Sequence, residues 1–209
     1  MLQALIQSPL AFLVFAIGLL LAIDIHEFSH AFVADRLGDP TPRSQGRLSL
    51  NPFVHLDPIG TLTLLLVGFG WGKPVEFDPY NLKKPRRDAA LISLAGPASN
   101  LILALLISIL GRIFVPNLYF GAFLVPLVYV NVILAVFNLV PIGPLDGQKI
   151  IFGLLPRDLA YEFQSIMSRY GLLILIFLLL PFFGTVPPIQ ALIGPIINFI
   201  LNFLLGINV

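Results

Sequence analysis

The sequence contains no cysteine, one tryptophan and only three histidines among 209 residues. Without cysteine there is no disulfide, no thiolate zinc cluster and no thiol nucleophile. Charged residues make up 11% of the chain, whereas a soluble domain has about 25%. Because 57% of the residues are hydrophobic, the composition predicts an integral membrane protein. Twelve basic against eleven acidic residues exclude the basic surplus that a nucleic-acid partner requires.

Long stretches without charged residues mark the expected membrane segments, since a helix needs about 20 residues to cross the hydrocarbon core. No Lys or Arg precedes the first stretch, so we expect a membrane helix there rather than a signal peptide. The stretch 59–72 would reach roughly 20 Å as a helix, which predicts a short or re-entrant element. The other uncharged stretches are 2–23, 89–111, 113–145 and 170–209. We expect five transmembrane helices in them, because 170–209 holds two helices separated by a turn at 181–188. The helix in 113–145 is expected near 119–141.

The positive charges are distributed unevenly between the two sides of this topology. If 59–72 does not cross, Arg112 lies opposite the other eleven basic residues. The positive-inside rule then makes the eleven-residue side cytoplasmic and places the N-terminus outside. We therefore expect an all-α polytopic protein of the plasma membrane with a small extended cytoplasmic hairpin or loop. Its single domain, 1–209, would comprise a core at 9–155 and C-terminal helices at 168–206.

Two of the three histidines, with a glutamate between them, end the first apolar stretch in the sequence "HEFSH" at 26–30. On a helix, His26 and His30 lie on one face, one turn apart, so both imidazoles can bind one Zn²⁺. Glu27 beside them can take a proton from a zinc-bound water, as in the H-E-x-x-H metalloproteases. The alternative is a pair of buried structural histidines, although ionisable groups inside a membrane usually serve function.

A catalytic zinc site needs a third protein ligand, for which the sequence offers three candidates. Asp24 would point to a different helix face from His26, so we expect it to partner a polar group within the bundle. His55 lies between two prolines and therefore in a turn. Asp146 follows the 119–141 segment on the cytoplasmic side, where Pro141 and Pro144 interrupt regular helix. It is the best candidate, although it could instead cap the next helix.

At these residues the chain resembles the site-2 protease family of zinc intramembrane metalloproteases, in its compact bacterial and archaeal form without a PDZ domain. The resemblance covers about residues 15–155. The resembling segments are "HEFSH" at 26–30, "GRLSLNPFVHLDPIGT" at 46–61, "WGKPVEFDP" at 71–79, "AGPASN" at 95–100 and "NLVPIGPLDG" at 138–147. It implies one zinc ion per chain with Asp146 as third ligand, Glu27 as catalytic base and then acid, and Asn100 in substrate binding.

The resemblance also implies transmembrane protein substrates, cleaved within or near their membrane segments in regulated intramembrane proteolysis. We expect the segment 72–80 to pair with the unwound substrate backbone, although a simple loop is an equal alternative. We expect His55 near the mouth of the active site, in a structural, gating or substrate-binding role. A membrane metal-ion transporter using the same His and Asp cluster is the alternative function. A regulatory membrane partner and an oligomer both remain open.

Overall fold

The computed structural model describes residues 8–67, 70–114, 123–182 and 185–206. Four helices in these ranges are long and apolar enough to span a membrane, and a fifth apolar helix is shorter. No strand occurs in the described residues, so the all-α membrane fold predicted from the sequence is confirmed. The four long helices are α2 (Pro9–Leu37), α5 (Pro85–Phe114), α9 (Arg157–Leu179) and α10 (Pro188–Leu205), and the shorter one is α7 (Val125–Asn138).

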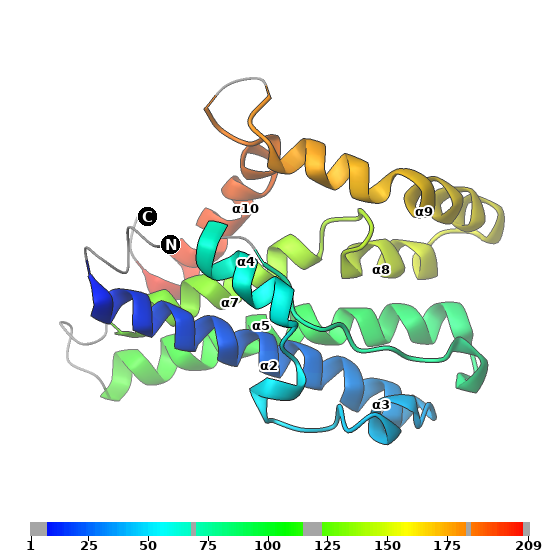
Figure 1. Cartoon of the computed structure of the whole chain (residues 1–209), viewed down its shortest axis with the longest axis horizontal. Helices are drawn as coiled ribbons and strands as arrows, with labels where there is room; N and C mark the ends of the chain where they lie inside the picture. Colours follow the sequence, from blue (N-terminus) through cyan, green and yellow to red (C-terminus); the bar gives the residue numbers. More distant parts are fainter. Residues whose placement is uncertain (1–7, 68–69, 115–122, 183–184, 207–209) are drawn as a thin grey trace.

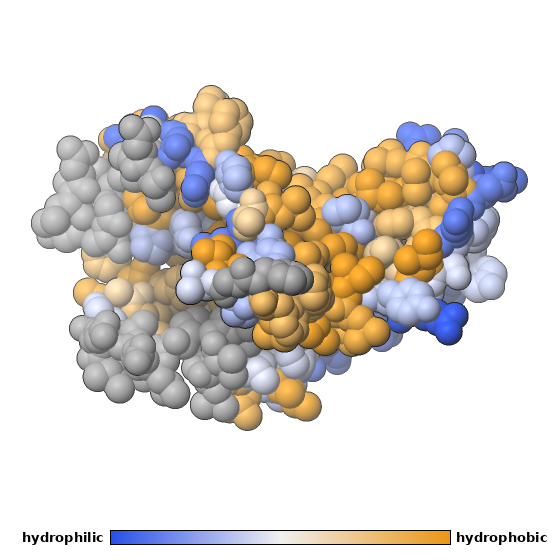
Figure 2. All heavy atoms as spheres, turned by 90° about the horizontal axis from the view of Figure 1, so that it is seen from above, coloured by the Kyte–Doolittle hydropathy of each residue, from blue (hydrophilic) through white to orange (hydrophobic). Residues whose placement is uncertain are grey.

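Helix α5 is the central helix and contacts α2, α7 and α8 (Asp146–Leu154). Figure 1 shows α2 and α5 side by side, with α9 on the opposite side of α8. Helix α10 packs on α7, where their buried aliphatic side chains form the main apolar core. Hydrophobic side chains dominate the middle of the molecule, and hydrophilic ones gather at the end where α9 begins (Figure 2).

Helix α2 continues 14 residues beyond the apolar stretch that ends at residue 23. It ends at Gly38, whose φ of +107° is the left-handed conformation that glycine adopts without a Cβ penalty. At 1.5 Å per residue the helix is about 43 Å long, well beyond the ~30 Å hydrocarbon core. The "HEFSH" motif therefore lies within a continuous helix, with almost two further turns after His30.

The short apolar element is helix α4 (Pro58–Val67), ten residues that reach only about 15 Å. Asp57 caps it by accepting a hydrogen bond from Gly60 N–H at 2.7 Å. The chain then returns and passes close to the first turn of α4. Glycine at position 60 makes room for this approach, since a Cβ there would lie 2.1 Å from the carbonyl oxygen of Trp71. A single antiparallel bridge joins Leu56 to Gly72. This return brings residues 70–78, here called the covering segment, alongside α2.

The remaining helices are short or begin away from their expected positions. Three are single turns: α3 (Thr41–Ser44), η1 (Pro52–Val54) and η2 (Pro79–Asn81). Helix α9 starts at Arg157, before the apolar residues that begin at 170, and turns back into α10 after Leu180. The first residues of the expected span 119–141 lie outside the described ranges, and α7 begins at Val125.

Candidate metal and catalytic site

The two histidines of α2 meet Asp146 in the interior of the protein. The His26 and His30 rings are 4.7 Å apart and nearly perpendicular, at 86°. Asp146 Oδ2 lies 3.1 Å from His26 Nε2 and 3.2 Å from His30 Nε2. Both histidines are buried, and Asp146 is mostly buried. Three potential ligand atoms from α2 and α8 thus converge, although 116 residues separate His30 from Asp146 along the chain.

Each histidine is oriented by a hydrogen bond at its other ring nitrogen. His30 Nδ1 donates to the carbonyl oxygen of Ile92 at 2.7 Å, and His26 Nδ1 donates to Asn100 Oδ1 at 2.6 Å. The Asn100 amide nitrogen donates to the Ala22 carbonyl, which fixes its oxygen toward His26. With the proton on Nδ1, the neutral form of each ring offers its Nε2 lone pair to a metal, and both Nε2 atoms face Asp146.

Asn100 is wholly buried and joins three helices. Besides His26 and Ala22 of α2, its amide nitrogen donates to Asn131 Oδ1 on α7 at 2.9 Å. Asn131 in turn donates to Leu127 in its own helix. Every polar group of the Asn100 side chain is therefore used in holding the histidine helix against α5 and α7. The structure places Asn100 behind His26, on the side away from Asp146.

A glycine of α5 allows the histidine rings to lie against that helix. A Cβ at Gly96 would lie 2.4 Å from His30 Nε2 and 2.7 Å from His26 Nε2. No real Cβ atom tolerates such separations, and neither ring can rotate away without losing its Nδ1 partner. Gly96 and Asn100 are four residues apart on α5, so they lie on the same face of the helix.

Asp146 is presented by the irregular chain between α7 and α8. Helix α7 ends at Asn138, and Asp146 is the first residue of α8. Gly147 lets that first turn approach the end of α7, since a Cβ there would lie 2.3 Å from the Val140 carbonyl oxygen. Burial raises the pKa of the Asp146 carboxyl, but the contacts with His30 and His26 outweigh this effect. The pKa of Asp146 therefore lies well below its usual range.

The three donor atoms fit a zinc ion. Two ligands bonded to zinc at about 2.0–2.1 Å and at the tetrahedral angle lie about 3.3 Å apart. The observed Asp146–histidine distances of 3.1 and 3.2 Å are close to this separation. Two imidazole nitrogens and one carboxylate oxygen are also a donor set that binds catalytic zinc and leaves its fourth position open.

Glu27 follows His26 and contacts the covering segment. Its Oε2 accepts a hydrogen bond from Val75 N–H at 3.0 Å and lies 3.9 Å from Arg47 Nη2. Arg47 is 3% exposed, and its burial lowers the pKa of the guanidinium. The negative charges of Glu27 and Glu76 offset part of this lowering. Arg47 also donates to the carbonyls of Val54 and Lys73. One buried guanidinium thus joins the loop before α4, the covering segment and the Glu27 carboxylate.

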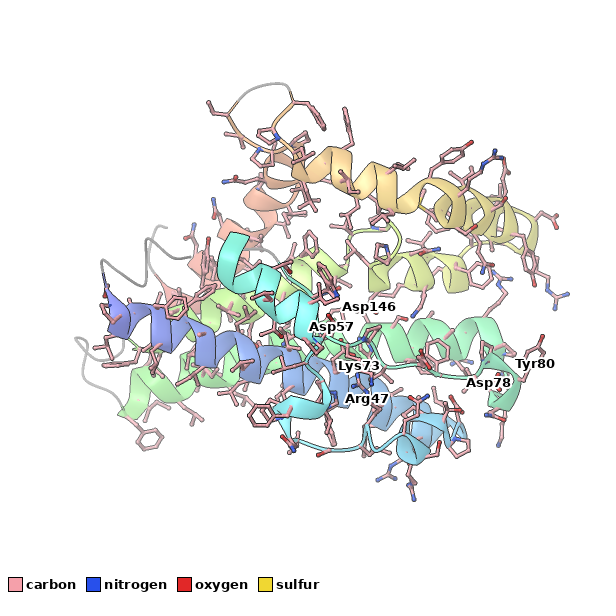
Figure 3. All side chains as sticks on the ribbon, in the orientation of Figure 1. Arg47, Asp57, Lys73, Asp78, Tyr80 and Asp146 are labelled. Atoms are coloured by element: carbon pink, nitrogen blue, oxygen red, sulfur yellow. The ribbon has the colours of Figure 1, made fainter. Side chains whose placement is uncertain are left out.

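His55 lies on the far side of this arrangement, fully buried beside Asp24. His55 Nε2 is 3.5 Å from Asp24 Oδ1 and 2.8 Å from the Ser49 carbonyl oxygen. Its own carbonyl accepts Lys73 N–H at 2.8 Å. His55 therefore lies between Asp24 of α2, Ser49 of its own loop and Lys73 of the covering segment. Arg47 and Lys73 lie together in Figure 3.

The far end of the covering segment is attached to the end of α2 by Asp39, which is fully buried. Its carboxylate accepts hydrogen bonds from Asp78 N–H at 2.7 Å and from the Asn81 amide at 2.8 Å. Thr41 donates through both its N–H and its hydroxyl. Burial raises the pKa of Asp39, but the four hydrogen-bond donors together outweigh burial. The pKa of Asp39 therefore lies below its usual value.

The site opens into a large cavity of about 1590 Å³. His26, Glu27, His30 and Asp146 line one part of its wall. Apolar residues of α2, α7, α9 and α10 and of the covering segment line much of the remainder. The volume exceeds the roughly 300–1,000 Å³ of a small-molecule pocket and is large enough for a length of peptide.

Of the six residues assigned to the site from the sequence, the structure brings together four: His26, Glu27, His30 and Asp146. Asn100 contacts His26 from behind, and His55 lies beside Asp24 and not among the three potential metal ligands. Three residues that position the site were not predicted from the sequence: Gly96, Asn131 and Arg47. None of them belongs to a metal-binding motif. The signal for Asn131 was available, because it is an amide in the middle of an apolar span.

A buried His₂Asp donor set, an adjacent glutamate and membrane-length helices define a metalloprotease embedded in a membrane. Residues 114–178 match the model of Peptidase family M50. YwhC of Bacillus subtilis, provisionally named a zinc metalloprotease, is 39% identical over 78% of both chains. Rip2 of Mycolicibacterium smegmatis, also provisionally so named, is 34% identical over 81% of this chain and 67% of its own.

A zinc metalloprotease of Methanocaldococcus jannaschii is 23% identical over 76% of this chain and 39% of its own. No solved structure gives a significant match. The chain belongs to Peptidase family M50, the site-2 protease family, and is a zinc metalloprotease. The resemblance drawn from the sequence motifs is thereby confirmed.

Proposed function

We propose that this protein hydrolyses peptide bonds within or near the transmembrane segments of other membrane proteins. The observation that carries this proposal is the position of His26, His30, Asp146 and Glu27 on the wall of one cavity. That cavity is bounded by apolar helices long enough to lie in a bilayer. A substrate reaching these four residues would therefore come from the membrane.

In this proposal His26 Nε2, His30 Nε2 and Asp146 Oδ2 hold one zinc ion per chain. When bound, zinc acts as a Lewis acid that polarises the scissile carbonyl and lowers the pKa of water. Asn100 and the Ile92 carbonyl keep the histidines in the tautomer that binds metal. We assign Asn100 this positioning role, in place of the substrate contact implied by the resemblance, because its side chain is fully buried and both of its N–H donors are used within the protein.

Glu27 acts as the general base and then as the acid. It accepts a proton from the attacking water and donates a proton to the leaving amine. The hydrogen bond from Val75 N–H fixes the direction of the Glu27 carboxylate, and the positively charged Arg47 lies 3.9 Å from it. The base is thus oriented by the covering segment rather than by its own helix.

The covering segment offers few backbone donors to a substrate. Lys73 N–H donates to His55, Val75 N–H to Glu27 and Asp78 N–H to Asp39, while Pro74 has no N–H. Within the described chain, the N–H groups of Glu76 and Phe77 have no acceptor. We propose that an unwound substrate pairs with this edge beside Glu76.

The cytoplasmic orientation of the site remains a proposal based on the distribution of Lys and Arg. We also propose that residues 1–209 act as one membrane-embedded domain, with core 9–155 and C-terminal helices 168–206. The partners would be the bilayer and single-span membrane proteins, in keeping with the family.

The first test compares the wild type with Glu27→Gln in detergent, measuring zinc content and cleavage of a single-span model substrate. We expect one zinc per chain in both proteins and at least a hundred-fold slower cleavage by the variant, because the amide cannot accept the proton. Arg43→Gln, an exposed change elsewhere, is the control. Absence of zinc from the folded wild type would refute the proposed metal site. Equal cleavage by both proteins would refute the role of Glu27.

The second test uses Glu76→Pro to remove one of the two free backbone donors of the edge, the one beside which the substrate is proposed to pair. We expect unchanged zinc content and roughly tenfold slower cleavage, with the loss mainly in KM, because proline has no N–H to bind substrate. Glu76→Ala, which keeps the N–H, is the matched control. If the alanine variant loses as much activity, the Glu76 side chain rather than the backbone edge is responsible.

A further inference from the structure

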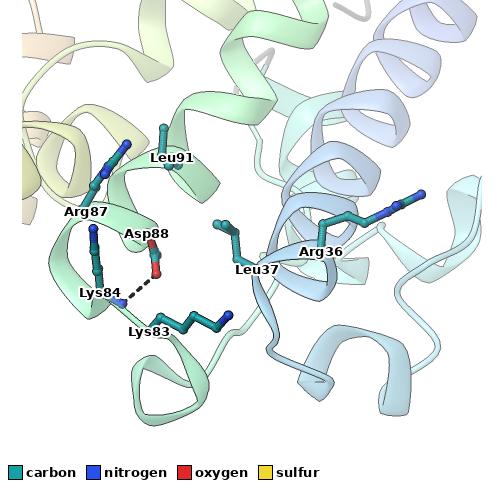
Figure 4. Close-up of a pocket in the computed structure, with 7 residues that line it drawn as sticks. All are labelled: Arg36, Leu37, Lys83, Lys84, Arg87, Asp88 and Leu91. Atoms are coloured by element: carbon teal, nitrogen blue, oxygen red, sulfur yellow. Dashed lines mark hydrogen bonds between the residues drawn. The ribbon is translucent and has the colours of Figure 1, made fainter.

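A second pocket lies away from the active-site cavity, where α2 ends and α5 begins (Figure 4). It encloses about 320 Å³. Its lining combines cationic and apolar side chains, with a single carboxylate: Arg36, Leu37, Lys83, Lys84, Arg87, Asp88 and Leu91. Figure 4 shows Lys84 beside Arg87 and Lys83 reaching toward Leu37, whereas Arg36 points away. The pocket thus has a positively charged side and an apolar side.

The cations of this pocket lack partners. In the described part of the chain, the side chains of Lys83, Lys84 and Arg87 have no hydrogen-bond acceptor and no ion pair. Two other cations near this end do have partners: Arg43 pairs with Asp35, and Arg86 donates to two carbonyls of the α8 region. Three neighbouring positive charges without a counter-ion make the pocket a candidate site for an external anion.

Asp88 forms no ion pair with these cations in the described residues. It is buried, and its Oδ2 accepts the backbone N–H of Lys84 at 2.8 Å, which fixes the carboxylate at the start of α5. Arg36 lies 4.9 Å from the ring of Phe32, so its guanidinium rests on an aromatic side chain that is 39% exposed. This pairing of a cation with an exposed aromatic ring suits the interface between water and lipid.

The depth of the pocket along its helices also indicates this interface. Residues 89–111 of α5 carry no charge, and Arg87 lies two residues before that apolar stretch. Leu91, on the pocket wall, already belongs to the stretch and is 42% exposed. The cations therefore lie at the level where lipid headgroups meet the hydrocarbon core, with exposed leucine immediately on the lipid side.

We propose that this pocket binds the phosphate of an anionic phospholipid. Lys83, Lys84 and Arg87 would surround the phosphate, and Leu37 and Leu91 would contact the glycerol backbone and the first acyl carbons. A soluble phosphate shares the charge chemistry but leaves the two leucines unused. Basic pockets between transmembrane helices are suited to anionic headgroups for this reason. The inference concerns binding alone and does not depend on the proteolytic function.

The test titrates short-chain phosphatidylglycerol into the detergent-purified protein at 0.15 M salt and counts bound lipid by native mass spectrometry. We compare the wild type with Lys84→Gln/Arg87→Gln and with the control Arg157→Gln/Arg169→Gln, which removes two exposed charges elsewhere. About thirty-fold weaker binding is expected for the pocket variant, because each cation near an anionic headgroup contributes about a factor of five. The control should stay within about twofold of the wild type, since its charges lie outside the pocket.

Three further arms separate the alternatives. Lys84→Arg/Arg87→Lys should retain binding, and phosphatidylcholine of the same chain length should bind at least tenfold more weakly. Inorganic phosphate at equal concentration should not displace the lipid. Equal loss in the control variant would refute the pocket in favour of diffuse charge. Displacement by inorganic phosphate would reassign the pocket to a soluble anion and overturn the lipid proposal.

Discussion

The two sides of the active site are built in different ways. Behind the histidines, α2, α5 and α7 are joined by side-chain hydrogen bonds among His26, Asn100 and Asn131, all buried. In front, the covering segment is held by backbone hydrogen bonds and by single side chains such as Glu27 and Arg47. The first side fixes the metal ligands, and the second fixes the base and the edge proposed for substrate. Metal binding and substrate handling should therefore respond to different mutations.

The side of the active site built from α2, α5 and α7 is here called the helical side, and the side formed by the covering segment the covering side. The largest expected effect is on the helical side and comes from Gly96→Ala. The new Cβ would occupy the space of both histidine Nε2 atoms, so we expect at least a hundred-fold loss of zinc affinity. Zinc content after dialysis against a graded chelator measures this change. Gly194→Ala on α10 is the matched control, since a Cβ there meets nothing within 4 Å. Normal zinc affinity in Gly96→Ala would show that the histidines do not bind metal against α5.

The next effect, also on the helical side, comes from Asn100→Ala. His26 Nδ1 would lose its acceptor and its fixed tautomer, and zinc affinity should fall about ten- to a hundred-fold. Asn138→Ala provides the comparison, because within the described residues that amide bonds only to Leu134 of its own helix. Zinc titration distinguishes the two variants. If Asn100→Ala keeps zinc but raises KM alone, Asn100 contacts substrate as the family resemblance implied.

On the covering side, Arg47→Met should separate the two functions. The variant keeps an unbranched side chain but loses the donors to Val54 and Lys73 and the charge near Glu27. We expect unchanged zinc content, cleavage slowed roughly tenfold, and faster amide hydrogen exchange in residues 72–78. Arg43→Met, which breaks an exposed ion pair with Asp35, should change neither. Loss of zinc from Arg47→Met would contradict the separation of the two sides.

The smallest expected effect concerns Asp39 and pH. Its pKa is lower in the folded protein than in the unfolded chain, so its stabilisation is present above about pH 4 and is lost as the pH falls through the folded pKa. Asp39→Asn should lower stability at pH 7 by about 1–2 kcal/mol and flatten this acid dependence. Thermal unfolding in detergent at pH 3 to 7 measures both. An unchanged pH profile would show that Asp39 does not stabilise this end of the segment.

Patterns within single segments explain what was predictable from the sequence. The absence of charge over 89–111 predicted a spanning helix there, and the four-residue spacing of His26 and His30 predicted a shared face. The convergence of Asp146 was inferred from the side of the membrane on which the chain emerges. These features depend on local periodicity and on bilayer thickness, which act on each segment separately.

Features that depend on contacts between distant segments were not accessible in this way. Arg47 is one arginine in a polar loop, and nothing local to it indicates burial against Glu27 and Lys73. The extension of α2 to Leu37 depends on Asp39 and Gly38 rather than on hydropathy. The role of Gly96 follows only from the packing of α5 on α2, where the missing Cβ provides room for two rings.

The hydrogen bond from Val75 N–H to Glu27 has a consequence for where a substrate is cut. This hydrogen bond fixes the position of Glu27 along the covering segment. The register in which a substrate pairs with the segment therefore decides which of its peptide bonds lies beside Glu27. Backbone pairing repeats every two residues, about 6.6 Å along a strand. A substrate that slips along the edge should therefore be cleaved at alternative bonds two residues apart, largely irrespective of its side chains.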